Sequence, residues 1–370
     1  MLATAEPNLG PDEKAALLDV IDSGWITMGA RVEAFEQEFA RLHDAEDAIA
    51  VSSCTGGLHM VMQAFGLGPG DEVLLPALTF VATANCVLYV GARPVFVDIV
   101  SAEQPLMSID NAAAKCTDRT RALILVHYAG YLADRARWRE FAATRGLILI
   151  EDAAHCAGLA EAGTFGDAAV FSFYGNKNMT TAEGGMIVAS DPVVRQRLRH
   201  LRGHGLTSGT FERHSKPMPG YDVIMLGFNY RMDELRAAIG ITQLKRLADW
   251  NRRRAALTEI YRALLAERAP EIVVPFAQGG RSSHHIMPVL LPRDVPRPPV
   301  IERLRAAGIQ TTIHYPPVHW FSFYRDQFPS LRLEVTEDFA ERELTLPLHP
   351  KLEDLQIDAI VQALANSLAN

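Results

Sequence analysis

The chain has 370 residues, of which 48% are hydrophobic, enough for one large core and a smaller second one. It carries 36 lysines and arginines against 44 aspartates and glutamates, and the net charge of -8 argues against nucleic acid as a partner. Four scattered cysteines form no disulfide framework, so we expect reduced thiols. The sequence has no leader-like start and no apolar run of the roughly 20 residues that cross a bilayer. We therefore expect a cytoplasmic protein.

Short apolar runs alternate with helical patterns between residues 47 and 190. Several runs are apolar on both faces, which is typical of strands that helices cover on each side of a mostly parallel sheet. The stretches between them, such as 57–65 and 135–144, have the length of right-handed crossover helices. The sequence thus predicts an α/β fold with strands beginning near residues 48, 72, 94, 122, 147, 169 and 186.

A charged, amphipathic stretch at 232–268 predicts one or two helices, interrupted mainly at Gly240. Beyond residue 270 the pattern mixes short strands with a helix at 299–308 and a closing helix at 354–368. We expect a large α/β domain at 1–245 and a small α+β domain at 246–370. Residues 205–222 form a long polar segment, which favours a lid or binding loop, with a surface excursion as the alternative.

Three segments at the ends of predicted strands contain residues that could bind a cofactor or react with it. A strand leads through Ser52 to Gly57 into a helix, where Thr55 and Gly56 could hold a phosphate, although plain helix capping is favoured for this segment alone. Another strand ends in Asp152, which could pair with a pyridinium nitrogen or simply cap a helix. Lys177 lies in a polar turn between two strands.

Most lysines are merely solvated, but a lysine that forms a Schiff base must reach its cofactor from a rigid position. Three segments in this order would bring a phosphate cradle, a ring-nitrogen carboxylate and an amine to one edge of the sheet. The order therefore favours a pyridoxal-type site over three unrelated surface features.

The sequence resembles the DegT/DnrJ/EryC1/StrS family of sugar aminotransferases over nearly its whole length. The similar blocks include VSSCTGGLHMVMQAFGLGPGDEVLLPALTFVATANCV at 51, EDAAHCAG at 151, FSFYGNKNMTTAEGGMIV at 171, LGFNYRMDELRAAIGITQLKRL at 226, HYPPVH at 314 and ELTLPLHP at 343. The resemblance implies the aspartate-aminotransferase fold (fold type I), pyridoxal 5'-phosphate (PLP) as cofactor, and a homodimer whose active site is shared across the interface.

The resemblance also assigns roles to single residues. It implies that Lys177 forms the Schiff base and that Asp152 forms a salt bridge with the pyridine nitrogen. It places Thr55, Gly56 and Ser172 at the cofactor phosphate. The remaining cofactor contacts that it implies are Phe80 on the ring face, His155 beside the ring, and Asn229 at the phosphate of the neighbouring subunit. Many relatives have His-Pro where this turn reads Tyr174-Gly175, which leaves the role of Tyr174 open.

The implied reaction moves an amino group from glutamate, the usual donor of the family, to a keto sugar carried on a nucleotide diphosphate. Lys177 would serve as nucleophile, base and acid. His155, at a position that is Gln or His in the family, favours the branch that aminates 4-keto-6-deoxyhexoses. Candidate sugar-nucleotide contacts are His319, Arg231 and Lys216, of which Arg231 could equally form a structural ion pair and Lys216 could simply be exposed.

Three alternatives compete with this interpretation. Dehydratases of the same family carry His in place of the lysine, and a non-catalytic PLP-binding regulator would usually have lost the lysine or the aspartate. A nicotinamide-linked oxidoreductase is disfavoured, because the glycines of GLGPGDE at 66 follow a helix and precede a strand, the reverse of the dinucleotide fingerprint. The histidine pairs lack a recognised zinc pattern, so we predict no metal.

Overall fold

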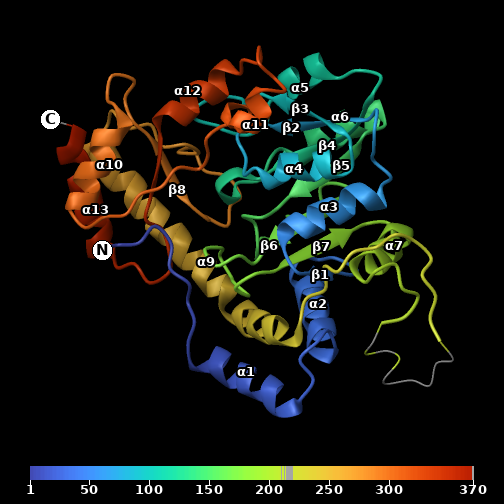
Figure 1. The fold of residues 1–370 in the computed structure, drawn as a ribbon. Helices are drawn as coiled ribbons and strands as arrows, with labels where there is room; N and C mark the ends of the chain where they lie inside the picture. Colours follow the sequence, from blue (N-terminus) through green and yellow to red (C-terminus); the bar gives the residue numbers. More distant parts are fainter. Residues whose placement is uncertain (210, 212, 214–219, 369–370) are drawn as a thin grey trace.

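The computed structural model describes residues 1–209, 211, 213 and 220–368. Its centre is a sheet of seven strands in the order β1-β7-β6-β5-β4-β2-β3 (Figure 1). Only β7 runs opposite to its neighbours β1 and β6, and the other pairings are parallel. The strands are β1 (Ile49–Val51), β2 (Glu72–Pro76), β3 (Arg93–Val97), β4 (Thr120–Val126), β5 (Ile148–Asp152), β6 (Ala168–Ser172) and β7 (Gly185–Ala189). All seven predicted strands are present, and the predicted α/β fold class is confirmed.

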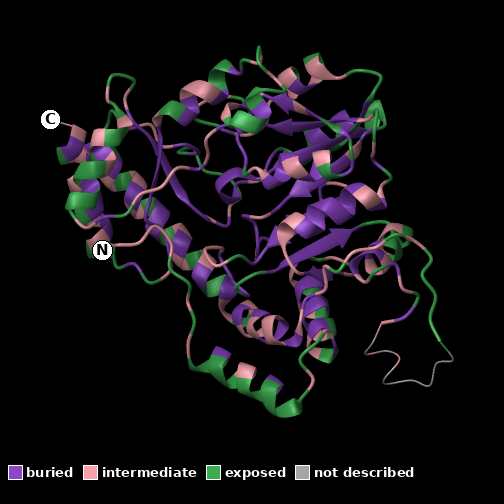
Figure 2. Ribbon diagram, in the orientation of Figure 1, coloured by how far each residue is buried: buried purple, intermediate pink, exposed green. Residues whose placement is uncertain are grey.

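The strands are apolar at nearly every position because both faces of the sheet are covered. Val73 and Leu75 of β2 pack into one core, whereas Leu74 between them packs into another. In Figure 2 the central strands are accordingly coloured as buried. One face is covered by α3 (Cys54–Ala64), α4 (Ala82–Tyr89) and α7 (Pro192–Arg202), and the other by α2 (Ala30–Leu42), α5 (Ile109–Lys115), α6 (Arg135–Arg145) and the first half of α9 (Glu234–Arg268).

The helix α9 is continuous, so Gly240 does not interrupt it. A Cβ atom at Gly240 would lie 2.6 Å from the Phe35 ring, so glycine lets α2 pack closely on α9. Leu247 of α9 belongs to the core beneath the large sheet, whereas Leu257 belongs to a separate core. The predicted boundary after residue 245 lies inside this helix, and the division into two domains stays a prediction.

The second core lies around a two-stranded antiparallel sheet. Its elements are β8 (Met287–Leu290), β9 (Glu343–Leu346), α10 (Arg297–Ala306) and α13 (Asp354–Leu368), together with the second half of α9. The first residues of the chain also lie here, since Leu2 pairs with Ile309 and Leu348 N donates to Thr4 O at 3.1 Å. The chain therefore begins beside its C-terminal part before α1 (Pro11–Ser23) crosses to the other end of α9 (Figure 1).

Further short elements lie above the sheet and beside the second core. They are α11 (Ser322–Arg325), α12 (Glu334–Arg342) and two 3₁₀ turns, Tyr128–Gly130 and Val318–Trp320. Over the described ranges, no helix combines the length and the apolar character needed to cross a membrane.

The carboxyl ends of β1, β4, β5 and β6 meet at one edge of the large sheet. Val51 and Ser172 both lie opposite Gly185, and Val126 lies opposite Asp152. Because β7 is antiparallel, its amino end lies at this same edge. The loops that leave these strands are therefore brought together, as expected for ligand sites in α/β sheets.

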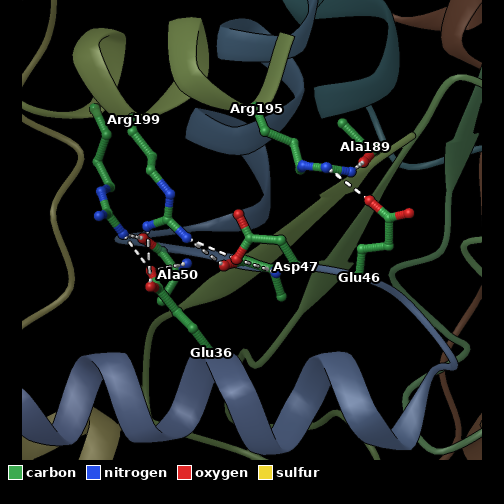
Figure 3. Close-up of polar contacts among 9 residues, drawn as sticks. Glu36, Glu46, Asp47, Ala50, Ala189, Arg195 and Arg199 are labelled. Carbon is green, nitrogen blue, oxygen red and sulfur yellow. Dashed lines mark hydrogen bonds and ion pairs between the residues drawn. The ribbon is translucent and has the colours of Figure 1, made fainter. Parts of the chain in front are cut away.

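A buried ionic network anchors α7 to α2 and β1 (Figure 3). The Glu36 carboxylate accepts from Arg202 Nη1 at 2.5 Å, from Arg199 Nη1 at 3.1 Å and from Ala50 N at 2.8 Å. Glu36 and Arg202 are both buried. Since Ala50 lies in the strand that leads into α3, the network holds that strand in place.

We expect Glu36→Ala to lower the free energy of unfolding by about 3 kcal/mol, because it leaves the Arg202 guanidinium buried without its carboxylate. The matched control is Glu46→Ala, which removes the exposed partner of Arg195 and should cost less than about 1 kcal/mol. Urea unfolding at one fixed protein concentration measures both values. Equal losses in the two variants would contradict the structural role of the network.

Candidate active site

A cavity of about 420 Å³ opens at the carboxyl edge of the large sheet. Loops after β1, β2, β5 and β6 line one side, and residues of the C-terminal part close the other. Six of the predicted site residues line this cavity, namely Thr55, Phe80, Asp152, His155, Ser172 and Lys177. Residues separated by more than 100 positions in sequence are thus brought to one place by the order of the strands.

Asp152 ends β5 and lies buried at the base of the cavity. Its Oδ2 accepts from Thr83 Oγ1 at 2.7 Å, and its Oδ1 accepts from Ala154 N at 3.2 Å. Thr83 in turn bonds to Thr79 Oγ1 at 2.7 Å. Burial raises the pKa of Asp152 despite these bonds. Both hydrogen-bond donors to this buried carboxyl are neutral. A cationic ring nitrogen beside it would supply the positive charge that favours the ionised form of the carboxyl.

Lys177 follows β6 at the end of a turn. The hydrogen bond that closes the turn runs from Lys177 N to Tyr174 O, at 3.0 Å. Burial is the largest cause that lowers its pKa, from 10.5 to about 8, and the nearby Cys54 and Asp152 oppose this shift. About a tenth of the amine is therefore neutral at pH 7, far more than for a solvated lysine. A neutral amine held beside a cavity can attack a carbonyl carbon and can accept a proton.

The first turn of α3 forms a cradle of hydroxyl and backbone N–H groups. Ser53 caps the helix by accepting from Gly56 N at 3.1 Å, and the Thr55 and Ser172 side chains face the cavity. A Cβ atom on Gly56 would come within 3.2 Å of the Tyr230 ring. Donors at a helix N-terminus beside two hydroxyls form a setting that suits a phosphate group.

His155 and Tyr315 form one wall of the cavity. His155 Nε2 lies 3.1 Å from the Tyr315 hydroxyl, and burial lowers the pKa of His155 well below its usual range, so the imidazole is neutral. Within the described part of the chain, the buried His155 Nδ1 has no hydrogen-bond partner. Phe80 is 57% exposed, with its ring 6.0 Å from that of Tyr315. An exposed aromatic ring beside a free imidazole nitrogen fits an aromatic cofactor.

The structure does not bring every predicted site residue to the cavity. His319 is 3% exposed, and its Nε2 lies 2.9 Å from Glu337 Oε1, away from the cavity lining. The first two residues of the same HYPPVH segment, His314 and Tyr315, line the cavity instead. Sequence reasoning also missed Thr83, the partner of Asp152, and Glu183, which lines the cavity.

Two other predicted residues lie elsewhere. Asn229 is exposed and pairs with Gly203, while Arg231 pairs with Val51 and lines a second cavity with Arg199 and Arg202. That cavity lies where α2 and α7 meet the loop at 205–209. Lys216 lies outside the described residues.

The fold and the cavity at its carboxyl edge are those of the PLP-dependent aminotransferases. The chain belongs to the DegT/DnrJ/EryC1/StrS aminotransferase family, whose model matches residues 7–365. The resemblance seen in the sequence is thereby confirmed, and the chain is an aminotransferase of this family.

Solved structures share the fold over the whole chain. The aminotransferase TlmJ from Streptoalloteichus hindustanus is 34% identical, with a TM-score of 0.90, covering 100% of this chain and 99% of its own. The sugar aminotransferase Spr1654 from Streptococcus pneumoniae, described as putative, is 26% identical in its PMP form, with a TM-score of 0.92 and coverage of 100% and 99%. It is also known in a PLP form. DesI, solved in the presence of its TDP-sugar product, is 31% identical, with a TM-score of 0.87 and coverage of 99% and 93%. The predicted cofactor, pyridoxal phosphate, is confirmed at the level of the family.

Proposed function

We propose that this enzyme transfers an amino group from glutamate to a nucleotide-diphosphate keto sugar, with a 4-keto-6-deoxyhexose as the favoured acceptor. The observation that carries the proposal is that Lys177 and Asp152 line one cavity, which also holds a phosphate cradle. The TDP-sugar product of the relative DesI supports a nucleotide sugar as the substrate class. His155 in place of glutamine supports the 4-keto branch.

Different residues at the cavity would bind different parts of PLP. Asp152 would face the ring nitrogen, and Thr55, Gly56 and Ser172 would hold the phosphate. Phe80 and His155 would enclose the ring, and Lys177 would bond to the cofactor. When bound, the cofactor supplies an electron sink that stabilises negative charge at the carbon next to the amine.

Lys177 then handles the protons. Because its pKa is lowered to about 8, Nζ can take a proton from the α-carbon of glutamate and later return one to the sugar carbon. Asp152 would keep its charge when it faces a cationic ring nitrogen, which favours the ionised carboxylate. His314 and Tyr315, in the position that sequence reasoning gave to His319, would contact the sugar. Arg231 lines the second cavity and not this one, so its contact with the nucleotide diphosphate stays a prediction, as does that of Lys216.

We also propose that the active site is shared by two subunits. Asn229 is exposed and lies three residues after a segment with exposed apolar side chains, which are Tyr221, Val223, Ile224 and Leu226. Apolar surface of this kind is usually covered by a partner, and the partner's copy of Asn229 would reach the phosphate cradle. Mixing of subunits tests this proposal: a dimer of one Lys177→Ala chain and one Asn229→Ala chain should keep one complete site. A mixed dimer without activity, made from chains that associate normally, would contradict it.

The substrate class is tested with the pyridoxamine-loaded protein and a panel of nucleotide keto sugars. A 4-keto-6-deoxyhexose carrier should restore the absorbance of the PLP form faster than 3-keto isomers do. Absorbance that glutamate removes but no sugar nucleotide restores would overturn the substrate class and leave the cofactor assignment intact. A protein that glutamate does not change at all would point to a non-catalytic regulator.

A further inference from the structure

A buried carboxyl lies directly behind the cavity wall. Glu343, the first residue of β9, is 0% exposed. Its Oε2 accepts from His314 N at 2.9 Å, and its Oε1 lies 2.5 Å from Thr345 Oγ1. The nearest guanidinium in this region, that of Arg297, bonds to the backbone oxygen of Glu343 at 2.8 Å and not to its carboxyl. Among the described residues, the carboxyl is thus bonded by neutral groups alone.

Thr345 links this carboxyl to the cavity. Its Oγ1 lies 2.9 Å from Nδ1 of His314, and His314 lines the cavity. The backbone holds the two segments in register, because Thr345 N donates to Thr312 O at 2.8 Å and Thr312 N donates to Thr345 O at 3.2 Å. The Tyr128 hydroxyl also donates to His314 O at 2.5 Å. The imidazole is therefore fixed in place from behind.

The Thr345 hydroxyl has one hydrogen, so the three side chains can be bonded in only two directions. If Glu343 is ionised, Thr345 donates to it, and His314 Nδ1 must carry the hydrogen that points at Thr345. The ring nitrogen Nε2 is then a bare acceptor. If Oε1 of Glu343 is protonated, Thr345 receives that hydrogen and donates its own to Nδ1. In this arrangement Nε2 carries the hydrogen and becomes a donor.

We propose that Glu343 and Thr345 are positioning residues that set the tautomer of His314, and so decide whether Nε2 offers the substrate an N–H or a lone pair. The proposal rests on the proposed function for the identity of the substrate, a keto sugar rich in hydroxyl and carbonyl oxygens. An N–H at Nε2 suits a carbonyl oxygen, which can only accept. The relay would thus help the cavity to bind and orient the keto form.

The charge states near neutral pH agree with the donor arrangement. Burial raises the pKa of Glu343 to about 8, with Arg297 opposing the shift, and burial lowers the pKa of His314 to about 4. His314 is therefore neutral while Glu343 titrates. The other titratable groups of the described chain that act on this pair are Tyr128, Tyr315, Lys177, His155 and His285. Below about pH 8 the relay makes Nε2 a donor, and above it an acceptor.

Ring ¹⁵N chemical shifts of histidine test the relay without substrate, so the result does not depend on the proposed function. The His314 signals are assigned by their loss in His314→Gln. In the wild-type protein, the hydrogen should move from Nε2 to Nδ1 as the pH rises through about 8. In Glu343→Gln the amide oxygen must accept from His314 N, so the NH2 group points at Thr345 and donates to it, and Nε2 should keep its hydrogen at every pH. Thr345→Ser should behave as wild type, and Thr345→Val should lose the pH dependence.

A matched control comes from another His–Glu pair, that of His319 and Glu337. Glu337→Gln alters the partner of His319 and should leave the His314 signals unchanged.

Kinetics give a separate measurement. Above pH 8, KM for the sugar nucleotide should rise in the wild type and stay flat in Glu343→Gln, while the glutamate half-reaction is unaffected. A His314 tautomer that is the same in wild type and Glu343→Gln across this pH range would overturn the proposal.

Discussion

Lys177→Ala is expected to lower the rate of both half-reactions by at least about 10⁴-fold, equivalent to roughly 5.5 kcal/mol of transition-state stabilisation. The loss is large because one amine both bonds to the cofactor and carries the protons. Among the described residues of the cavity, Lys177 alone has the partly neutral amine that these steps need. Single-turnover absorbance changes with glutamate, and then with the sugar nucleotide, measure the two half-reactions separately.

The matched control is Lys115→Ala. Lys115 is also a partly buried lysine with a lowered pKa, but its Nζ donates to Phe96 O at 2.6 Å, away from the cavity. It should keep the wild-type rate. Borohydride reduction of the holoprotein, followed by mass spectrometry, should label the peptide that contains Lys177 and no other. Wild-type turnover in Lys177→Ala, or a label on another lysine, would refute the assignment.

The lowered pKa of Lys177 gives a dependence on pH with a definite sign. Below about pH 8 the amine is protonated, and its neutral fraction falls about tenfold for each further unit. The rate at which the apoprotein captures pyridoxal phosphate should therefore rise with pH and level off near 8. A fully solvated lysine would continue to gain reactivity up to about pH 10.4. Free Nα-acetyl-lysine, measured in parallel, corrects for ionisation of the aldehyde itself.

The large sheet could be predicted from sequence because its strands are covered on both faces. In β4, Leu123 and Ile124 point to different cores, and both must therefore be apolar. Such runs differ clearly from the amphipathic helices around them. The candidate site followed from the same reasoning, since Asp152 ends one strand and Lys177 lies in the turn after another, and these strand ends must lie at one edge.

The partners of these residues could not be predicted in the same way. Thr83, which donates to Asp152, lies 69 residues earlier in a helix with no distinctive pattern. In HYPPVH the two prolines rule out a helix, but they do not reveal which end of the segment faces the sheet. Sequence reasoning chose His319, whereas His314 and Tyr315 line the cavity. Glu343 likewise looks like an ordinary surface acid in the sequence, and only the pairing of β9 with β8 shows that it is buried.

Asp152→Asn is the second change with a large expected effect, a loss of about 10³-fold in the glutamate half-reaction. Among the described residues of the cavity, the carboxylate is the only acid besides Glu183, which is exposed, and an amide cannot hold a ring nitrogen in its cationic form. The variant should still bind the cofactor through Lys177 and the phosphate cradle, so the absorbance of the bound form should persist. The fall should therefore lie in the rate of proton removal and not in occupancy.

Asp152→Asn should not lower the stability of the apoprotein, although it lowers the activity. Burial raises the pKa of Asp152 in the folded chain above its unfolded value, so ionising this carboxyl costs folding free energy, and stability is lost as the pH rises through that pKa. The side-chain amide in Asp152→Asn cannot ionise; it keeps the bond from Thr83 through its oxygen and gives up the longer, 3.2 Å bond from Ala154 N. The apo form of this variant should thus melt no lower than apo wild type at neutral pH, and the advantage should disappear under acidic conditions.

Thr83→Val is the companion variant, because it removes a donor to Asp152 but keeps the charge of the carboxylate. It should lower stability and reduce activity only about tenfold. Melting temperatures of the two apo variants, measured beside the wild type across the same pH range, separate the charge of Asp152 from its hydrogen bonds. A melting temperature for apo Asp152→Asn below that of the wild type at neutral pH would show that the carboxylate has a charged partner in the apoprotein, and the fit to a cationic ring would then lose its basis.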